Sequence, residues 1–386
     1  MRLTSKVLVS ILAVGLSVGM TASPSSAAFV TSTPRASTTS FNGTVNTVVY
    51  SGSTIYVGGS FTEATGPSGK VYTRRGAAAI NAKTGGVLAW NPYTNGSVNA
   101  ITLRGKYAYL GGDFSRVRGA ALYNVAKVAA ARFGRVFPKF KYRTDRPVHA
   151  LAKRGKYLYV GGEFTRMKGK ARARLAAIDL GRPALARWTP STNGVVNVLK
   201  TSKKRVFVAG EFTRLNGSRK VHNVGMLRRS DGARVKAFRA AVAQPVADIE
   251  VTKRRIYVGT GGIGGHVFAL RRGTGRTLWS RTFDGDVDAL ALMGRRLYVG
   301  GHFANRCETS RTGYAGRCLD GGKARGRLAA FLIGGQLAPW SPNADSADGV
   351  LALSQSTALN QLAAGGAFYK FAGGVKQRSF ALFTAS

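Results

Sequence analysis

The sequence has few acidic residues. Only 16 of its 386 residues are Asp or Glu, against 58 Lys or Arg, so the formal net charge is +42. Such an imbalance predicts attraction to polyanions and repulsion within the chain, and it carries no information about fold. Nucleic acid is the usual partner of so basic a protein, but the beginning of the sequence indicates a compartment in which nucleic acid is not expected.

The sequence also lacks long apolar runs, apart from one. Arg2 and Lys6 precede a mainly apolar run over residues 7–20, and Ser26-Ala27-Ala28 offers small residues for cleavage. This order is typical of a secretory signal, and the run is short for a membrane span. We expect residues 1–28 to be a signal peptide cleaved after Ala28, with an uncleaved anchor as the alternative. We expect the mature protein to be secreted, without a transmembrane segment, and its charge could retain it on the cell envelope.

Cysteine is nearly absent, since Cys307 and Cys318 are the only two. In an exported protein such a pair is most simply a disulfide that closes one loop. Two thiolates could also bind a metal, but neither a second pair nor a nearby His-x-x-x-His motif accompanies them. We therefore expect a disulfide, no metal and no cofactor.

Motifs of catalysis are missing as well. The sequence contains four histidines in four separate regions, no Gly-x-Ser-x-Gly elbow and no His-Glu-x-x-His. The glycine-rich run over residues 261–265 does not open a helix, so it does not predict dinucleotide binding. These absences leave catalysis unsupported without excluding it.

The sequence does contain a repeat. Seven segments begin with Val and lead into an apolar strand that in most copies ends in Gly-Gly, as over residues 157–162. The repeats begin near residues 45, 98, 148, 196, 246, 287 and 350, a spacing close to the kelch period of about 50 residues. Each unit predicts four short strands separated by glycine turns, which is the pattern of one β-propeller blade. The fourth strand is expected at Trp90, Trp188, Trp279 or Trp340 in four of the units.

The two ends of the repeat region complement each other. The last unit stops after its third strand, near Phe383. Residues 37–41 lead into the first unit in the same way that the fourth strand of a unit leads into the next unit. We predict that residues 33–41 complete the seventh blade and so remove exposed sheet edges. The expected fold is all-β: a single seven-bladed β-propeller over residues 29–386, closed by an N-terminal strand that completes the last blade.

The repeat has a recognisable pattern. Tyr-Val-Gly-Gly-x-Phe-Thr, Ala-Ala-Ile-Asp and Trp-x-Pro-x-x-Asn-Gly-x-Val follow one another over residues 159–196. This pattern resembles the delta-60-repeat propellers of exported bacterial proteins and is more distantly similar to kelch and galactose-oxidase-type propellers. The resemblance covers residues 33–386 and implies an architecture, because the repeat of this family predicts no activity. The fifth unit departs from it, since Gly259-Thr260-Gly261-Gly262 lacks the following Phe-Thr.

Polar residues recur at two positions of the repeat. The residue after the first Val and the residue after Gly-Gly are both expected near the propeller axis, on the same face. The polar residues at these positions are Asn46, Asn99, His149, Asn197, Asp288, Asp113, Glu163, Glu211 and His302. They could line the mouth of a central channel and bind a small ligand or cation. Alternatively, they bond to turn backbone and loop amides.

Lys and Arg are abundant at both ends of the expected blades, so the sequence does not single out one basic surface. Arginine forks could bind phosphate, sulfate or carboxylate groups, and a merely solvated surface is the alternative. The repeated Trp and Phe residues are expected to pack between blades instead of stacking on carbohydrate.

The sequence thus favours a secreted, basic, monomeric β-propeller binding protein that acts at the cell surface or in the extracellular matrix. Its expected partner is an anionic cell-envelope polymer or an acidic polysaccharide. The first alternative is a propeller oxidoreductase or lyase that acts on a carbohydrate at the channel mouth. The second is a structural envelope component that does neither.

Overall fold

The computed structural model describes residues 29–346 and 348–385, so the expected signal peptide lies outside the described residues. Within these ranges the chain forms strands and two short 3-10 helices, η1 (Tyr314–Gly316) and η2 (Ala372–Gly374), and no α-helix. No helix in the described part of the chain has the length and apolar character needed to cross a membrane.

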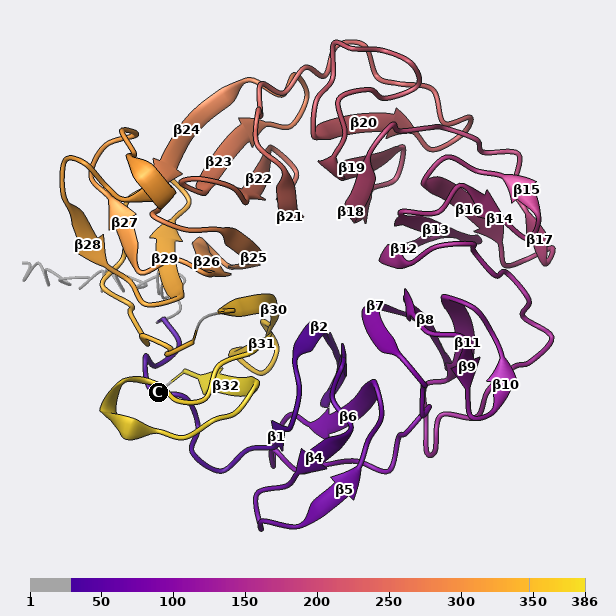
Figure 1. Cartoon of the computed structure of the whole chain (residues 1–386), viewed down its shortest axis with the longest axis horizontal. Helices are drawn as coiled ribbons and strands as arrows, with labels where there is room; N and C mark the ends of the chain where they lie inside the picture. Colours follow the sequence, from indigo (N-terminus) through magenta and orange to yellow (C-terminus); the bar gives the residue numbers. More distant parts are fainter. Residues whose placement is uncertain (1–28, 347, 386) are drawn as a thin grey trace, which may run out of the picture.

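Seven larger antiparallel sheets stand in a ring around a central opening (Figure 1). The first strand of each sheet lies at the centre, and we number the sheets in chain order. The first strands are β2 (Val45–Ser51), β7 (Ser97–Arg104), β12 (Val148–Arg154), β18 (Val195–Thr201), β21 (Val246–Val251), β25 (Val287–Met293) and β30 (Val350–Ser356). The second strands are β3 (Thr54–Gly59), β8 (Tyr107–Asp113), β13 (Tyr157–Gly162), β19 (Arg205–Glu211), β22 (Arg255–Thr260), β26 (Arg296–Gly301) and β31 (Gln361–Gly366).

The third strands continue each sheet outward. They are β6 (Ala77–Asn81), β11 (Val125–Ala129), β16 (Leu175–Asp179), β20 (Val224–Arg228), β23 (His266–Arg271), β29 (Leu328–Leu332) and β32 (Phe380–Thr384). Four of the connections between second and third strands hold a pair of short strands that the sequence did not predict. These are β4 (Glu63–Thr65) with β5 (Val71–Thr73), β9 (Arg116–Val117) with β10 (Ala120–Ala121), β14 (Arg166–Met167) with β15 (Lys170–Ala171), and β27 (Asn305–Cys307) with β28 (Gly322–Ala324).

The predicted fourth strand is a named strand in only two sheets of the described chain, the third with β17 (Ala184–Leu185) and the fifth with β24 (Thr277–Thr282). In the first, second, fourth and sixth sheets the fourth segment pairs with the third strand through a single β-bridge, as between Ile80 and Val87. Trp90, Trp188 and Trp340 are each followed two residues later by Pro, which has no N–H to donate to a ladder. Trp279 has no such Pro, and its strand β24 is the longer of the two.

The segment that pairs with the last strand differs from the predicted 33–41. Val30 bridges Ala385, the Thr31 amide donates to the Thr384 carbonyl at 2.9 Å, and the Arg35 amide donates to the Leu382 carbonyl at 2.8 Å. By contrast, β1 (Ser40–Phe41) pairs with β4, beside the first sheet. Residues 30–35 therefore run along β32, and the chain then crosses to the next sheet.

Contacts between neighbouring sheets explain two features of the repeat. A Cβ added to Gly161 would lie 2.6 Å from Val196 Cγ1, so the first glycine of Gly-Gly makes room for the first Val of the next sheet. The tryptophans also join neighbouring segments. Trp90 Nε1 donates to the Ala129 carbonyl at 2.7 Å, and Trp188, Trp279 and Trp340 donate to Arg228, Ile333 and Thr31 in the same way. These tryptophans therefore serve packing.

The predicted disulfide is confirmed. Cys307 and Cys318 are bonded, with their Cα atoms 5.2 Å apart. The bond ties the end of β27 to the loop that precedes β28, beside the sixth sheet.

Candidate functional site

A β-bulge occurs at the same position in all seven sheets. In each pairing of first and second strands the register shifts just after the opening Val, as between Val148 and Ala150. A bulge leaves one residue without a partner and re-aims its side chain. The seven bulged residues are Asn46, Asn99, His149, Asn197, Ala247, Asp288 and Leu351, and all of them line a central cavity of about 260 Å³. The residues predicted from the first position of the repeat thus meet at the axis, and the bulge is the physical reason.

A chain of polar contacts links the first three sheets. Asn46 Nδ2 donates to Asn99 Oδ1 at 3.1 Å, and Asn99 Nδ2 lies 3.5 Å from His149 Nδ1. Because an amide nitrogen can only donate, Nδ1 is the accepting nitrogen of the ring, and Nε2 then carries the proton. His149 Nε2 lies 2.8 Å from Glu163 Oε1, to which it donates. The chain therefore ends in a histidine–carboxylate pair at the channel mouth.

The fourth sheet repeats part of this arrangement. Asn197 Nδ2 is 3.2 Å from Glu211 Oε1 and 3.1 Å from the Val246 carbonyl. An amide thus joins the carboxylate after the second strand to the backbone of the next sheet. In both the third and fourth sheets the two repeat positions predicted from sequence are in direct contact.

Four of the predicted residues do not line the cavity itself. Glu163 and Glu211 contact it only through His149 and Asn197. Asp113 lines a separate pocket between the second and third sheets, and the exposed His302 has no side-chain hydrogen bond in the described chain. All four lie at the end of a second strand or just after it, and second strands lie one strand spacing of about 4.8 Å farther from the axis than the first strands. His149 and Asn197 bridge that distance to Glu163 and Glu211, whereas Asp113 and His302 have no such partner in the described chain.

Three charged residues on the first strands were not predicted from the sequence. Lys200 and Asp248 line the cavity, and Lys200 Nζ lies 2.9 Å from Glu250 Oε1, across the fourth and fifth sheets. Lys200 and Glu250 each lie four residues after the opening Val of their strand, so they share one level of the channel. Opposite charges at one repeat position of adjacent units are the signal that could have found this pair.

Burial shifts the acidity of the channel carboxyls. It raises the pKa of Asp288 to about 7, and the neighbouring Asp286 adds to the rise. Burial also raises the pKa of Asp248 to about 6, although the Lys200 ammonium opposes it. Burial alone would lower the pKa of Lys200, but Glu250 and Asp248 outweigh that effect and raise it. The channel therefore holds one ammonium among three carboxyl groups, an environment suited to polar or cationic groups and unsuited to a polyanion.

Several other acidic residues hold the loops of the mouth. Asp145 Oδ1 accepts from the amides of Thr165 and Arg166, both at 2.9 Å. The equivalent acceptors in other units are Asn42, Asn95, Asn193, Asp284 and Asp345. These side chains fix the loops after the second strands, and none of them belongs to the two repeat positions predicted from the sequence. In the described residues no group of three or more His, Cys, Asp or Glu side chains could hold a metal.

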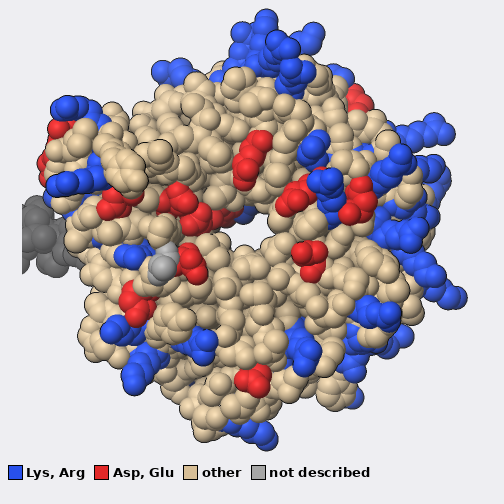
Figure 2. Space-filling model, in the orientation of Figure 1, with Lys and Arg blue, Asp and Glu red and all other residues tan. Residues whose placement is uncertain are grey.

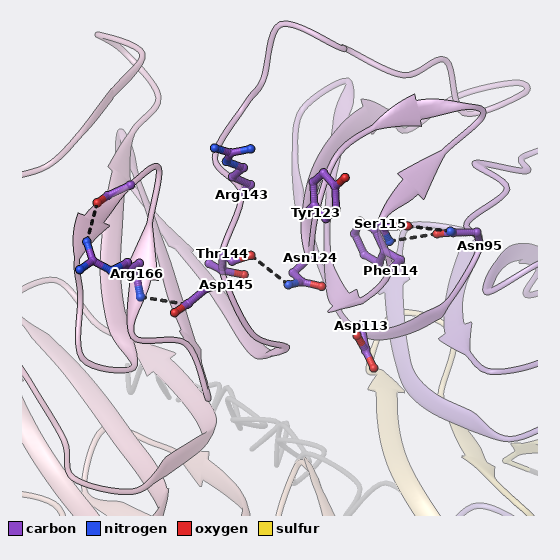
Figure 3. A pocket seen from close by; sticks show the side chains of 11 residues that line it. Asn95, Asp113, Phe114, Ser115, Tyr123, Asn124, Arg143, Thr144, Asp145 and Arg166 are labelled. Carbon is purple, nitrogen blue, oxygen red and sulfur yellow. Dashed lines mark hydrogen bonds between the residues drawn. The ribbon is translucent and has the colours of Figure 1, made fainter.

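A pocket of about 630 Å³ opens between the second and third sheets (Figure 3). Arg143 and Arg166 lie at one end and Asp113 lies at the other, with Tyr123, 45% exposed, beside them. The Asn124 amide donates to the Thr144 carbonyl at 3.2 Å and joins the two sheets behind the pocket. With charges of both signs, the pocket is not specialised for anions.

Charge is unevenly distributed over the molecule. On the face shown in Figure 2, acidic side chains gather around the central opening, and Lys and Arg side chains lie mainly toward the outer edge. A negatively charged polymer would therefore be repelled at the central opening and attracted at the outer rim of the molecule.

Comparisons with known proteins identify the fold. No protein-family model and no curated protein matches the sequence. Among solved structures, the chain is similar to the WD40 repeats of RRP9, with a TM-score of 0.58 and 12% identity over 91% of this chain and 98% of that chain. It is similar to the WD40 β-propeller domain of Doa1 (0.53, 10%, 93% and 98%) and to the computationally designed Ika8 protein (0.51, 13%, 90% and 98%). At these identities the comparisons show architecture alone: the chain is an all-β protein with a β-propeller fold.

Proposed function

We propose that this protein is an exported β-propeller that binds anionic polymers at the cell surface or in the extracellular matrix. The observation that carries the proposal is its unpaired positive charge. Without Arg2 and Lys6 of the expected signal, 56 of the 58 Lys and Arg residues remain. In the described chain only four of them form an ion pair with a carboxylate: Lys156, Lys200, Arg228 and Arg311. Some of the others donate to backbone carbonyls, as Arg74 and Arg174 do, but their positive charge is not neutralised by a carboxylate of the described chain.

We further propose that the seven larger sheets are the blades of one closed ring and that the protein is a monomeric member of the delta-60-repeat propellers. Contacts between consecutive first strands around the ring, including β30 with β2, support closure. The hydrogen bonds of residues 30–35 to β32 support completion of the last blade by the N-terminal segment. The Tyr-Val-Gly-Gly-x-Phe-Thr pattern supports the family assignment.

The proposed binding is tested with a matched pair of polymers. Dextran sulfate and uncharged dextran share one carbohydrate backbone and differ in anionic groups. The mature chain, residues 29–386, is expected to bind dextran sulfate at moderate ionic strength and to ignore dextran, measured by calorimetry or by retention on the immobilised polymers. Equal binding to both would contradict a role for charge, and absence of binding to dextran sulfate and to polyphosphate would overturn the proposed function.

One contact favours a second candidate function, catalysis on a carbohydrate at the channel mouth. The His149–Glu163 pair, at 2.8 Å, has the geometry of a proton-transfer couple, and it lies partly exposed beside the cavity. This function requires turnover of a sugar substrate that Glu163→Gln reduces by about 10²-fold or more. An unchanged rate in that variant would exclude the pair from the chemistry.

A further inference from the structure

The turns at one end of the fourth and fifth sheets carry a strongly unbalanced charge. The strands of each sheet are antiparallel. The turn between the first and second strands and the turn after the third strand therefore lie at the same end of the strands. We call this the turn edge. In the fourth and fifth sheets it comprises residues 202–205, 228–234, 252–255 and 271–276. These residues include twelve Lys or Arg and a single acid, Asp231, which is already paired with Arg228 at 2.8 Å.

A groove of about 800 Å³ is built into this surface. We call it the basic groove. Its cationic lining residues are Arg205, Lys253, Arg254, Arg255, Arg271 and Arg272, and no Asp or Glu lines it. Leu278 of the fifth sheet, which is 37% exposed, and the half-buried Val235 supply apolar surface above the buried Met226. The groove thus combines six cations with a small apolar surface.

Part of the basic groove is fixed before any ligand arrives. Arg272 Nη1 donates to the Thr252 carbonyl at 3.2 Å, and the guanidinium lies over the Phe207 ring, 5.3 Å from its centroid. The Arg255 guanidinium donates to the Ile333 carbonyl. The turn after β23 is also held against the fourth sheet, since the Arg239 amide donates to the Thr274 carbonyl at 2.8 Å. These contacts hold Arg255, Arg272 and the turn after β23 in place.

Other cations of the groove remain free for a ligand. Lys253, Arg254 and Arg271 are exposed, and in the described chain none of the six lining cations pairs with a carboxylate. Like charges held this close repel one another, and a polyanion relieves that repulsion on binding. Guanidinium groups in addition match the oxygens of phosphate or sulfate through paired hydrogen bonds.

We propose that the basic groove is the binding site for a linear polymer that carries phosphate or sulfate groups. The inference rests on the proposed function and names the site at which it operates. The cations contact the anionic groups, and Val235 and Leu278 pack against the carbon skeleton between them. The polymer then lies on the turn edge, away from the acidic channel opening, so the protein is held on an anionic surface in one orientation.

The test compares two triple charge reversals with the same change in net charge. K253E/R254E/R271E alters the basic groove, and R166E/K168E/K170E alters the exposed β14–β15 hairpin on the opposite edge. Binding of the mature chain to polyphosphate and to dextran sulfate is measured at about 0.15 M salt. The groove variant is expected to lose roughly 10²-fold or more in affinity and the hairpin variant about threefold, since specific contacts add to the general loss of charge. Equal losses would overturn the groove and leave the proposed function standing.

Further measurements separate the remaining outcomes. The milder variant R254Q/R271Q, with an unchanged thermal midpoint, is expected to lose roughly tenfold in affinity and so guards against a folding artefact. Groove-dependent binding of only one of the two polymers would identify phosphate or sulfate as the group recognised, and in either case supports the inference. Groove-dependent binding of duplex DNA that is much tighter than that of both polymers would overturn it in favour of a nucleic acid. Failure of the wild type to bind either polymer would overturn the proposed function itself.

Discussion

A Cβ atom added to Gly112 would lie 2.0 Å from the carbonyl oxygen of Ser97, on the neighbouring first strand. Atoms cannot approach so closely, and the obstacle is backbone, so it cannot rotate away. By contrast, a Cβ on the preceding Gly111 would meet the side-chain atom Val148 Cγ1 at 2.6 Å. Ala209 naturally occupies the equivalent of Gly111 in the fourth sheet. The two glycines of the repeat are therefore constrained differently.

Gly112→Ala is expected to lower the free energy of unfolding by about 2–4 kcal/mol, and Gly111→Ala by about half as much or less. Urea unfolding followed by tryptophan fluorescence measures both. The fifth sheet has Thr260 in place of the second glycine, so its backbone leaves room for a side chain, whose hydroxyl donates to Gln244 and accepts from the His266 amide. Equal losses in the two variants would contradict the backbone constraint.

The raised pKa of Asp288 predicts a pH-dependent stability. With a folded-state pKa of about 7 and an unfolded value of about 3.9, the folded protein retains a proton that the unfolded chain has released. Stability from this group therefore falls as pH rises between these two values. Asp288→Asn is expected to raise the thermal midpoint at about pH 8 and to flatten its change between about pH 5 and pH 8.

The control for this prediction is Asp231→Asn. The Ala233 amide and the Arg228 guanidinium lower the pKa of Asp231, so its stabilising effect is present at neutral pH and is lost as pH falls. Its replacement should lower the midpoint at neutral pH. Identical pH profiles for the wild type and Asp288→Asn would show that the Asp288 carboxyl is not shifted.

Loss of the Cys307–Cys318 bond is expected to loosen one loop and leave the ring intact. The bond closes a short segment over a sequence separation of 11 residues, and closing such a loop stabilises by at most about 3 kcal/mol in the chain-entropy model. In Cys307→Ser/Cys318→Ser, amide hydrogen exchange should rise within residues 305–324 and stay unchanged in β25 and β26. Faster exchange throughout the molecule would show that the disulfide supports the whole fold.

Much of the architecture could be predicted because short sequence patterns specify each strand of the repeat and its ends. Each apolar strand ending in Gly-Gly specifies a close approach, and the polar residue after the opening Val lies at the bulge and reaches the axis. The N-terminal segment was predicted to pair over residues 33–41, but residues 30–35 pair with β32. The register of this strand could not be predicted because it occurs once and cannot be aligned with a repeat.

Features made by contacts between distant units could not be predicted in the same way. The Lys200–Glu250 pair joins residues 50 positions apart, and each is unremarkable within its own strand. The basic groove likewise combines turns of the fourth and fifth sheets with Met226 and Val235. In the sequence, Lys and Arg occur in the turns at both ends of the expected blades. Only the fold shows that no Asp or Glu lines the basic groove.

The most direct test of charge-driven binding is the salt dependence of affinity for dextran sulfate and polyphosphate. Release of counterions makes the logarithm of affinity fall linearly with the logarithm of salt concentration, by roughly 0.7–0.9 for each ionic contact on nucleic acids. We expect a steep slope, equivalent to several contacts, with both polymers. Binding that persists unchanged at about 1 M salt, where such contacts are screened, or that is restricted to a polymer without anionic groups, would contradict the account.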